Sequence, residues 1–121
     1  MKKGIRNLLL SCFALATVVG TLTFGISAAT TYVYHHGNDY STNTCYASTT
    51  ASAPASIGAK ITWQLSGSNT VSNGPYVSNS GAYSITSSSY SLDGLSGKSY
   101  GYFYIGGVQT GQSTAWMDFT F

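Results

Sequence analysis

The chain has 121 residues, of which 43% are hydrophobic, 14% aromatic and only 7% charged, and its formal net charge is +2. This length allows one domain. Three of the five basic residues stand at the start of the chain, at Lys2, Lys3 and Arg6. Nucleic-acid binding requires several cations that neutralise phosphates, so the two lysines that remain exclude it.

The first 29 residues have the order of features found in a secretory signal peptide. The basic start is followed by an uncharged run over residues 8–26 and then by the small residues Ser27, Ala28 and Ala29. This pattern predicts a signal peptide of residues 1–29 and a single secreted domain of residues 30–121. A retained membrane anchor is the alternative, although threonines and glycines dilute the apolar run.

Removal of the signal peptide changes the charge balance of the chain. The charged residues that remain are two lysines and three aspartates: Lys60, Lys98, Asp39, Asp93 and Asp118. The net charge of the secreted part is then −1, so electrostatic attachment to a membrane surface is not expected. We also expect no stable membrane span after cleavage.

Residues 30–121 show the alternation that is typical of strands and no helical periodicity. Apolar residues recur at every second position in four short runs: Tyr32 and Tyr34; Ile61, Trp63 and Leu65; Tyr83 and Ile85; Tyr90 and Leu92. Gly-rich turn signals such as "SNGP", "LDGLSG" and "IGGVQTG" separate the runs. The spacing predicts an all-β domain of six to seven antiparallel strands, in a sandwich or small barrel. Residues 48–56 are either a strand followed by a loop at Pro54 or a mobile linker.

The segment "LSGKSY" combines Leu95, Gly97 and Tyr100. This spacing resembles the tyrosine corner of Greek-key sandwiches such as fibronectin type III and other immunoglobulin-like domains. The resemblance implies a small antiparallel Greek-key β-sandwich in which Tyr100 faces the core and pins a crossover between sheets. It also suggests that Trp63 is a core tryptophan. A fold of this kind does not imply a function.

The orientation of Tyr100 determines which aromatic side chains we expect on the surface. If Tyr100 faces the core, alternation places Phe103 and Ile105 on the outer face. A hairpin around the loop of residues 106–113 would set Tyr100 opposite Phe119 and bring Phe103 opposite Trp116. Phe103, Ile105 and Trp116 then form an exposed apolar patch, which is the predicted binding site. Alternatively, the chain's own N-terminal segment covers the patch, or these side chains only stabilise the hairpin.

The segment "YHHGND" carries the candidate metal ligands His35, His36 and Asp39. Imidazole is a common metal ligand, but adjacent residues of a strand face opposite ways, so both histidines reach one ion only if the chain turns there. Because no second ligand cluster occurs, we expect neither a metal nor a cofactor. The stretch "YHHG" is similar to one in secreted lactococcin-type bacteriocins, small β-sandwich proteins, which implies a secreted antibacterial polypeptide as an alternative function.

Cys45 is the only cysteine after the signal peptide. Alternation places it on the same strand face as Ala47, so we expect a buried thiol that packs as a small hydrophobic group. A disulfide to another chain and a reactive thiol remain alternatives. Pairing of Cys45 with His35 or His36 would allow an enzyme, a minor alternative because nothing in the sequence orients the imidazole.

Together these features predict a small exported protein that acts by binding or assembly rather than by catalysis. The expected location is the cell surface or the extracellular medium, and the expected partner is a protein or glycan of the cell envelope, or a second copy of the chain. The sequence does not distinguish among these partners.

Overall fold

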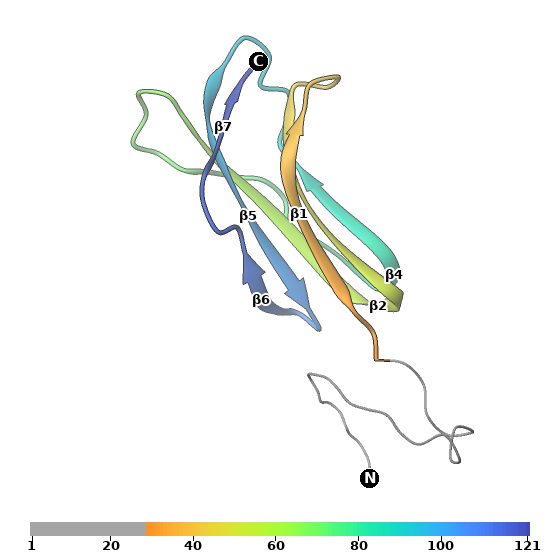
Figure 1. Ribbon diagram of the computed structural model, residues 1–121. Helices are drawn as coiled ribbons and strands as arrows, with labels where there is room; N and C mark the ends of the chain where they lie inside the picture. The colour runs from red at the N-terminus through yellow and green to blue at the C-terminus, as the bar shows by residue number, and fades with distance from the viewer. Residues whose placement is uncertain (1–28) are drawn as a thin grey trace, which may run out of the picture. The chain divides into compact units, whose positions relative to one another are not determined.

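The computed structural model describes residues 29–121, so the predicted signal peptide falls almost wholly outside the described residues. The prediction of an all-β chain is confirmed for residues 29–121, which form one seven-stranded antiparallel sheet without a helix (Figure 1). The strands are β1 (Tyr32–Asp39), β2 (Thr44–Leu65), β3 (Ser72–Asn73), β4 (Val77–Ser88), β5 (Ser96–Ile105), β6 (Val108–Gln112) and β7 (Met117–Thr120).

Strand β2 organises the sheet because it pairs with four other strands. Its first half lies between β1 and β4, and its second half pairs with β5 along one edge and with β3 and β4 along the other. The strand folds back between these halves, so that the Thr49 hydroxyl donates to the Gly58 carbonyl at 2.7 Å. The pairing register shifts on both sides of Ala55, where Figure 1 shows β2 turning. The sequence predicted a loop at Pro54, whereas the strand continues through this residue.

The core fills the space between the two halves of β2. Its buried residues come from β2, β5, β7 and the β4–β5 connection: Cys45, Ala47, Ala59, Ile61, Trp63, Leu92, Phe103 and Phe119. Trp63 is 1% exposed, and its ring meets that of Tyr90 edge to face at 5.1 Å between centroids. Burial of large apolar side chains is the main source of stability in such a domain.

The β5–β6 connection is tighter than the sequence suggested. Gly106 and Gly107 have φ angles of 62° and 80°, which form a two-residue turn with positive φ at both positions. Side chains with a Cβ atom rarely adopt these angles, so the two glycines fix where the hairpin turns. The predicted loop of residues 106–113 is therefore wrong, because β6 begins directly after the turn.

The register of β7 on β5 also differs from the prediction. Phe119 lies opposite Gly97 rather than opposite Tyr100, a shift of three positions along β5. An odd shift exchanges the two faces of a strand. Phe119 points into the core as its own alternation predicted, but Tyr100 points outward and packs against Trp116.

The residues of the segment "LSGKSY" thus do not lie where the resemblance to a tyrosine corner predicted them. Leu95 is 41% exposed, and Tyr100 is half-buried on the outer side of the sheet. Gly97 is required for packing, because a Cβ atom there would overlap the Gln64 carbonyl oxygen of the neighbouring strand. The physical reason for the inverted face is the small inner row of β5, Ser99 and Gly101, which leaves room for Ala47 of β2.

Candidate functional site

The predicted outward patch of Phe103, Ile105 and Trp116 is not assembled. Phe103 is 2% exposed and faces the interior of the fold, where its ring stacks on Tyr34 at 4.7 Å with an interplanar angle of 6°. Ile105 pairs with the buried Ile57 on the same inner face. Of the three, only Trp116 is well exposed, at 38%.

The other face of β5 carries the aromatic row that the sequence assigned to the core. Tyr100, Tyr102 and Tyr104 are half-buried there, opposite Thr62, Lys60 and Gly58 of β2. Two further aromatic side chains join this row. We call the whole set the aromatic face: Tyr76, Tyr100, Tyr102, Tyr104 and Trp116.

Ring contacts hold the aromatic face together. The ring centroid of Tyr100 lies 5.3 Å from that of Tyr102 and 5.2 Å from that of Trp116. At the other end of the row, Tyr104 meets Tyr76 edge to face at 4.7 Å. Such offset and edge contacts fix ring orientations while leaving part of each ring accessible. Burial, and to a smaller extent the neighbouring Tyr76 and Tyr102, raise the pKa of the Tyr104 hydroxyl.

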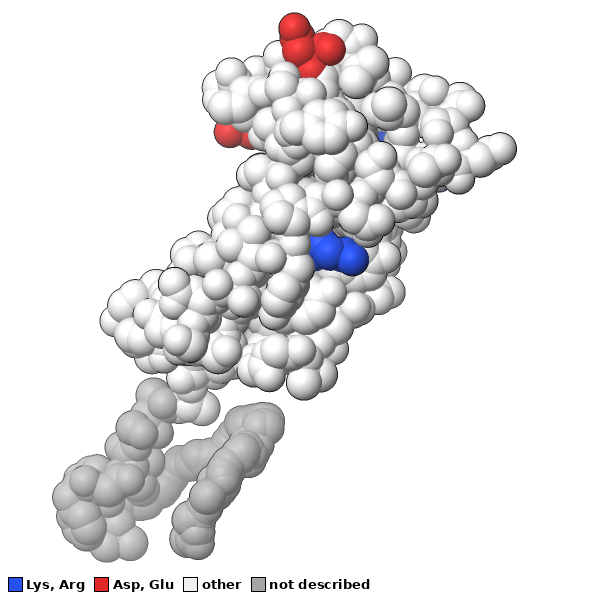
Figure 2. Space-filling model, turned by 180° about the vertical axis from the view of Figure 1, so that it is seen from behind, with Lys and Arg blue, Asp and Glu red and all other residues white. Residues whose placement is uncertain are grey.

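Both lysines of residues 29–121 lie on this face. The ammonium nitrogen of Lys60 stands 5.5 Å from the ring centroid of Tyr102, and that of Lys98 stands 5.2 Å from the ring centroid of Trp116. These distances allow cation–π attraction. On the side drawn in Figure 2, acidic side chains lie near one end and a lysine lies in the middle of a largely uncharged surface.

Sequence reasoning missed Tyr76, Lys60 and Lys98 as parts of one surface. Lys98, Tyr100, Tyr102 and Tyr104 alternate at every second position, which signals a shared strand face. A lysine at one end of this row indicated that the row faces water, since an unpaired lysine is rarely buried. Tyr76 gave no such signal, because it lies outside β5 and reaches Tyr104 through the tertiary fold.

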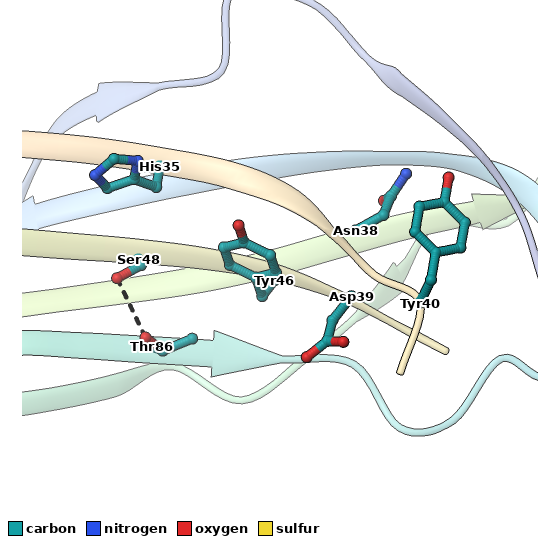
Figure 3. Close-up of a pocket in the computed structure, with 7 residues that line it drawn as sticks. All are labelled: His35, Asn38, Asp39, Tyr40, Tyr46, Ser48 and Thr86. Carbon is teal, nitrogen blue, oxygen red and sulfur yellow. Dashed lines mark hydrogen bonds between the residues drawn. The ribbon is translucent and has the colours of Figure 1, made fainter. Parts of the chain in front are cut away.

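The two histidines point to opposite sides of β1, so their imidazole rings do not converge on one ion. His35 lines a surface hollow on the outer side of β1, β2 and β4, in which Figure 3 shows it at the far end from Asp39 with Tyr46 between them. His36 points the other way, toward Ser99 and Ser113. Among residues 29–121, no three potential metal-ligating side chains gather around one point.

His36 links β1 to β5 and to the segment after β6. Its Nε2 atom lies 2.7 Å from the Ser99 hydroxyl and its Nδ1 atom 2.9 Å from the Ser113 hydroxyl, which also accepts the Gly101 amide hydrogen at 2.8 Å. Burial lowers the pKa of His36, so the ring is neutral at pH 7. Ser99 also hydrogen-bonds to the Cys45 thiol. If it donates there, Nε2 carries the imidazole hydrogen and Nδ1 accepts from Ser113.

The Cys45 thiol lies within the core rather than in an accessible site. It is fully buried, and burial raises its pKa, an effect that the hydrogen bond from Ser99 offsets in part. A raised pKa disfavours the thiolate, which is the nucleophilic form. Ser99 bonds to both the thiol and His36. The arrangement thus suits a packed polar network better than an accessible Cys/His pair.

The aromatic face is therefore the candidate functional site. In residues 29–121 no helix has the length and apolarity needed to cross a bilayer. No family model matches the chain, and neither the curated proteins nor the solved structures contain a match to it.

Proposed function

We propose that the protein is a non-enzymatic binding module that holds a glycan on its aromatic face. The observation that carries the proposal is the row of Tyr100, Tyr102 and Tyr104 on one side of a single strand, extended by Trp116 at one end. Alternate residues of a strand stand roughly 7 Å apart. The row therefore offers successive aromatic surfaces along one line to an extended ligand.

The chemistry of this surface suits a sugar polymer. Partly exposed tyrosines offer an apolar ring and a hydroxyl at the same place, which matches the apolar face and polar rim of a sugar ring. The rings stand on β5, which has hydrogen-bonded neighbours along both edges and is thus a rigid support. A nucleic acid would require more cations than Lys60 and Lys98 supply.

The location of the protein and its fold type are part of the same proposal. The signal-peptide pattern of residues 1–29 supports export, so the glycan would belong to the cell envelope or the extracellular medium. The sheet folded over a shared core supports a β-sandwich, whereas the immunoglobulin-like type rests on the sequence resemblance of residues 95–100 alone. An antibacterial polypeptide stays an alternative function, based on the "YHHG" stretch alone.

Co-sedimentation of residues 30–121 with separated peptidoglycan, membrane and secreted-protein fractions tests the proposal. We expect binding to a glycan fraction, a change in tryptophan fluorescence on binding, and loss of binding in Tyr102→Ser. Tyr83→Ser is the matched control, because Tyr83 is 61% exposed on β4 and belongs to no aromatic contact of the face. Thermal unfolding of both variants shows whether folding is preserved. Binding only to proteins or membranes, or equal binding by both variants, would contradict the proposal.

A further inference from the structure

The charges of residues 29–121 are unevenly placed around the aromatic face. Both lysines extend from the outer side of β2 and β5. In the strand registers, Lys60 lies opposite Tyr102 and Lys98 lies opposite Asp118. The other two aspartates have partners elsewhere. The carboxylate of Asp39 accepts hydrogen bonds from Ser41, and that of Asp93 accepts one from the Asn43 amide.

The two lysines differ in how far their charge is already balanced. Lys98 is exposed, so water screens its charge, and its register partner on β7 is the acidic Asp118. Lys60 is half-buried, and its outward neighbours are Tyr102 across the strand pair and Gly58 and Thr62 along β2. None of these neighbours is acidic. The attraction of Lys60 for an anion is therefore uncompensated, and partial burial reduces the screening by water.

The position of Lys60 places this charge beside the middle of the tyrosine row. Its ammonium group lies over the ring of Tyr102, between the positions of Tyr100 and Tyr104 along β5. A sugar ring that stacks on these tyrosines would bring its substituents to the edge of the row, within reach of a flexible lysine. A negatively charged substituent would be attracted by Lys60 there, and a neutral substituent would not.

We infer that the glycan is acidic, and that Lys60 contacts its carboxylate or phosphate groups while the tyrosines stack on its sugars. This inference rests on the proposed function and specifies its ligand. It assigns Lys60 and Lys98 different roles, although both are lysines over an aromatic ring on the same face. The difference between them supplies the test.

The test compares three soluble polymers: polygalacturonate, its fully methyl-esterified form and poly(glycerol phosphate). Esterification removes the charge and keeps the sugar backbone, so the first two form a matched pair. We expect polygalacturonate to bind roughly two- to fivefold more tightly than its ester, as is typical of one partly exposed ion pair. The preference should shrink as salt is raised. Poly(glycerol phosphate) carries phosphate groups but no sugar rings, so it should bind more weakly than polygalacturonate; equally tight binding would show that charge alone, without stacking on sugars, holds the ligand.

Lys60→Gln should abolish this preference, Lys60→Arg should retain it, and Lys98→Gln should change it little. Thermal unfolding of each variant checks that the fold is intact. Equal or weaker binding of polygalacturonate than of its ester, or loss of the preference in Lys98→Gln alone, would overturn the inference. In those cases the proposed function still holds if Tyr102→Ser loses binding to every polymer. Failure of all three polymers to bind would count against both.

Discussion

At the scale of single residues, Gly111 has a packing role, because the absence of a side chain there leaves space for the ring of Tyr34. The ring of Tyr34 stacks on Phe103, and a Cβ atom added at Gly111 would lie 2.5 Å from the Tyr34 ring. The hydroxyl of Tyr34 is also held by Thr110 at 2.8 Å, so the ring has little freedom to move aside. We expect Gly111→Ala to lower the free energy of unfolding by about 1–3 kcal/mol, as overpacking typically does. Urea unfolding measures the change.

Gly81→Ala provides the matched control for this prediction. A Cβ atom at Gly81 meets no other atom within 4 Å, and the residue lies in β4 without a positive φ angle. We expect this substitution to change the free energy of unfolding by no more than about 0.5 kcal/mol. A similar loss in both variants would show that Tyr34 is not held against Gly111 as described.

At the scale of elements, the attachment of β1 to β5 should depend on pH through His36. Burial lowers the pKa of His36 below its ordinary value of 6.5 in the folded chain. As pH falls through 6.5, the unfolded chain binds a proton that the folded chain does not, so the free energy of unfolding falls with it. This dependence should end below the folded pKa of His36. The other groups close to the ring are the Ser99 and Ser113 hydroxyls and, beyond Ser99, the Cys45 thiol.

Thermal unfolding between pH 7.5 and 5 measures this effect, in about the range where histidine titrates. Asp39 also has a lowered pKa, caused mainly by its hydrogen bonds to Ser41, but its stability contribution is lost only below its ordinary value of 3.8. We expect the slope to disappear in His36→Gln and to persist in His35→Gln, because His35 lies on the outer side of β1. A slope that survives in His36→Gln and vanishes in His35→Gln would refute the assignment.

Strand β5 shows what alternation can and cannot predict. Period-two alternation correctly separated Tyr100, Tyr102 and Tyr104 from Phe103 and Ile105, because successive side chains of any strand face opposite ways. It could not tell which set faces inward. Tyrosine is stable on either side of a sheet, and the inner row of β5 contains Ser99 and Gly101, which are inconspicuous in a sequence. Their place in the core depends on Ala47, which reaches them only after β2 has folded back.

At the scale of the whole molecule, the sequence predicted strand content and core candidates better than connectivity. Trp63 and Cys45 stood in short alternating runs whose inner members are buried in any strand of a folded sheet. The 22-residue length of β2 was not predictable in this way. Its two halves look like separate strands, since the Ser/Thr/Ala stretch between them shows no alternation and contains Pro54. The aromatic face depends on the second half of β2, so only some of the residues of this face could be predicted from the sequence.

The central place of β2 predicts how the molecule opens. Residues 57–65 of β2 pair with β5 along one edge, and residues 57–59 and 62–63 also pair with β4 and β3 along the other, whereas β6 and β7 are short and pair only with β5. Local opening costs least where few contacts must break. Hydrogen–deuterium exchange followed by NMR should therefore find the slowest amides in this part of β2 and in its partner β5, and faster exchange in β6 and β7.

The same exchange experiment separates two ways in which the aromatic face could be supported. If β2 and β5 form its rigid base, their amides stay protected while β6 opens, and Tyr100, Tyr102 and Tyr104 keep their positions during such openings. If β6 or β7 exchanges as slowly as β2, the molecule opens only as a whole. The tyrosine row would then owe its rigidity to the complete fold rather than to the pairing of two strands, and variants in β6 would disturb ligand binding as strongly as variants in β5.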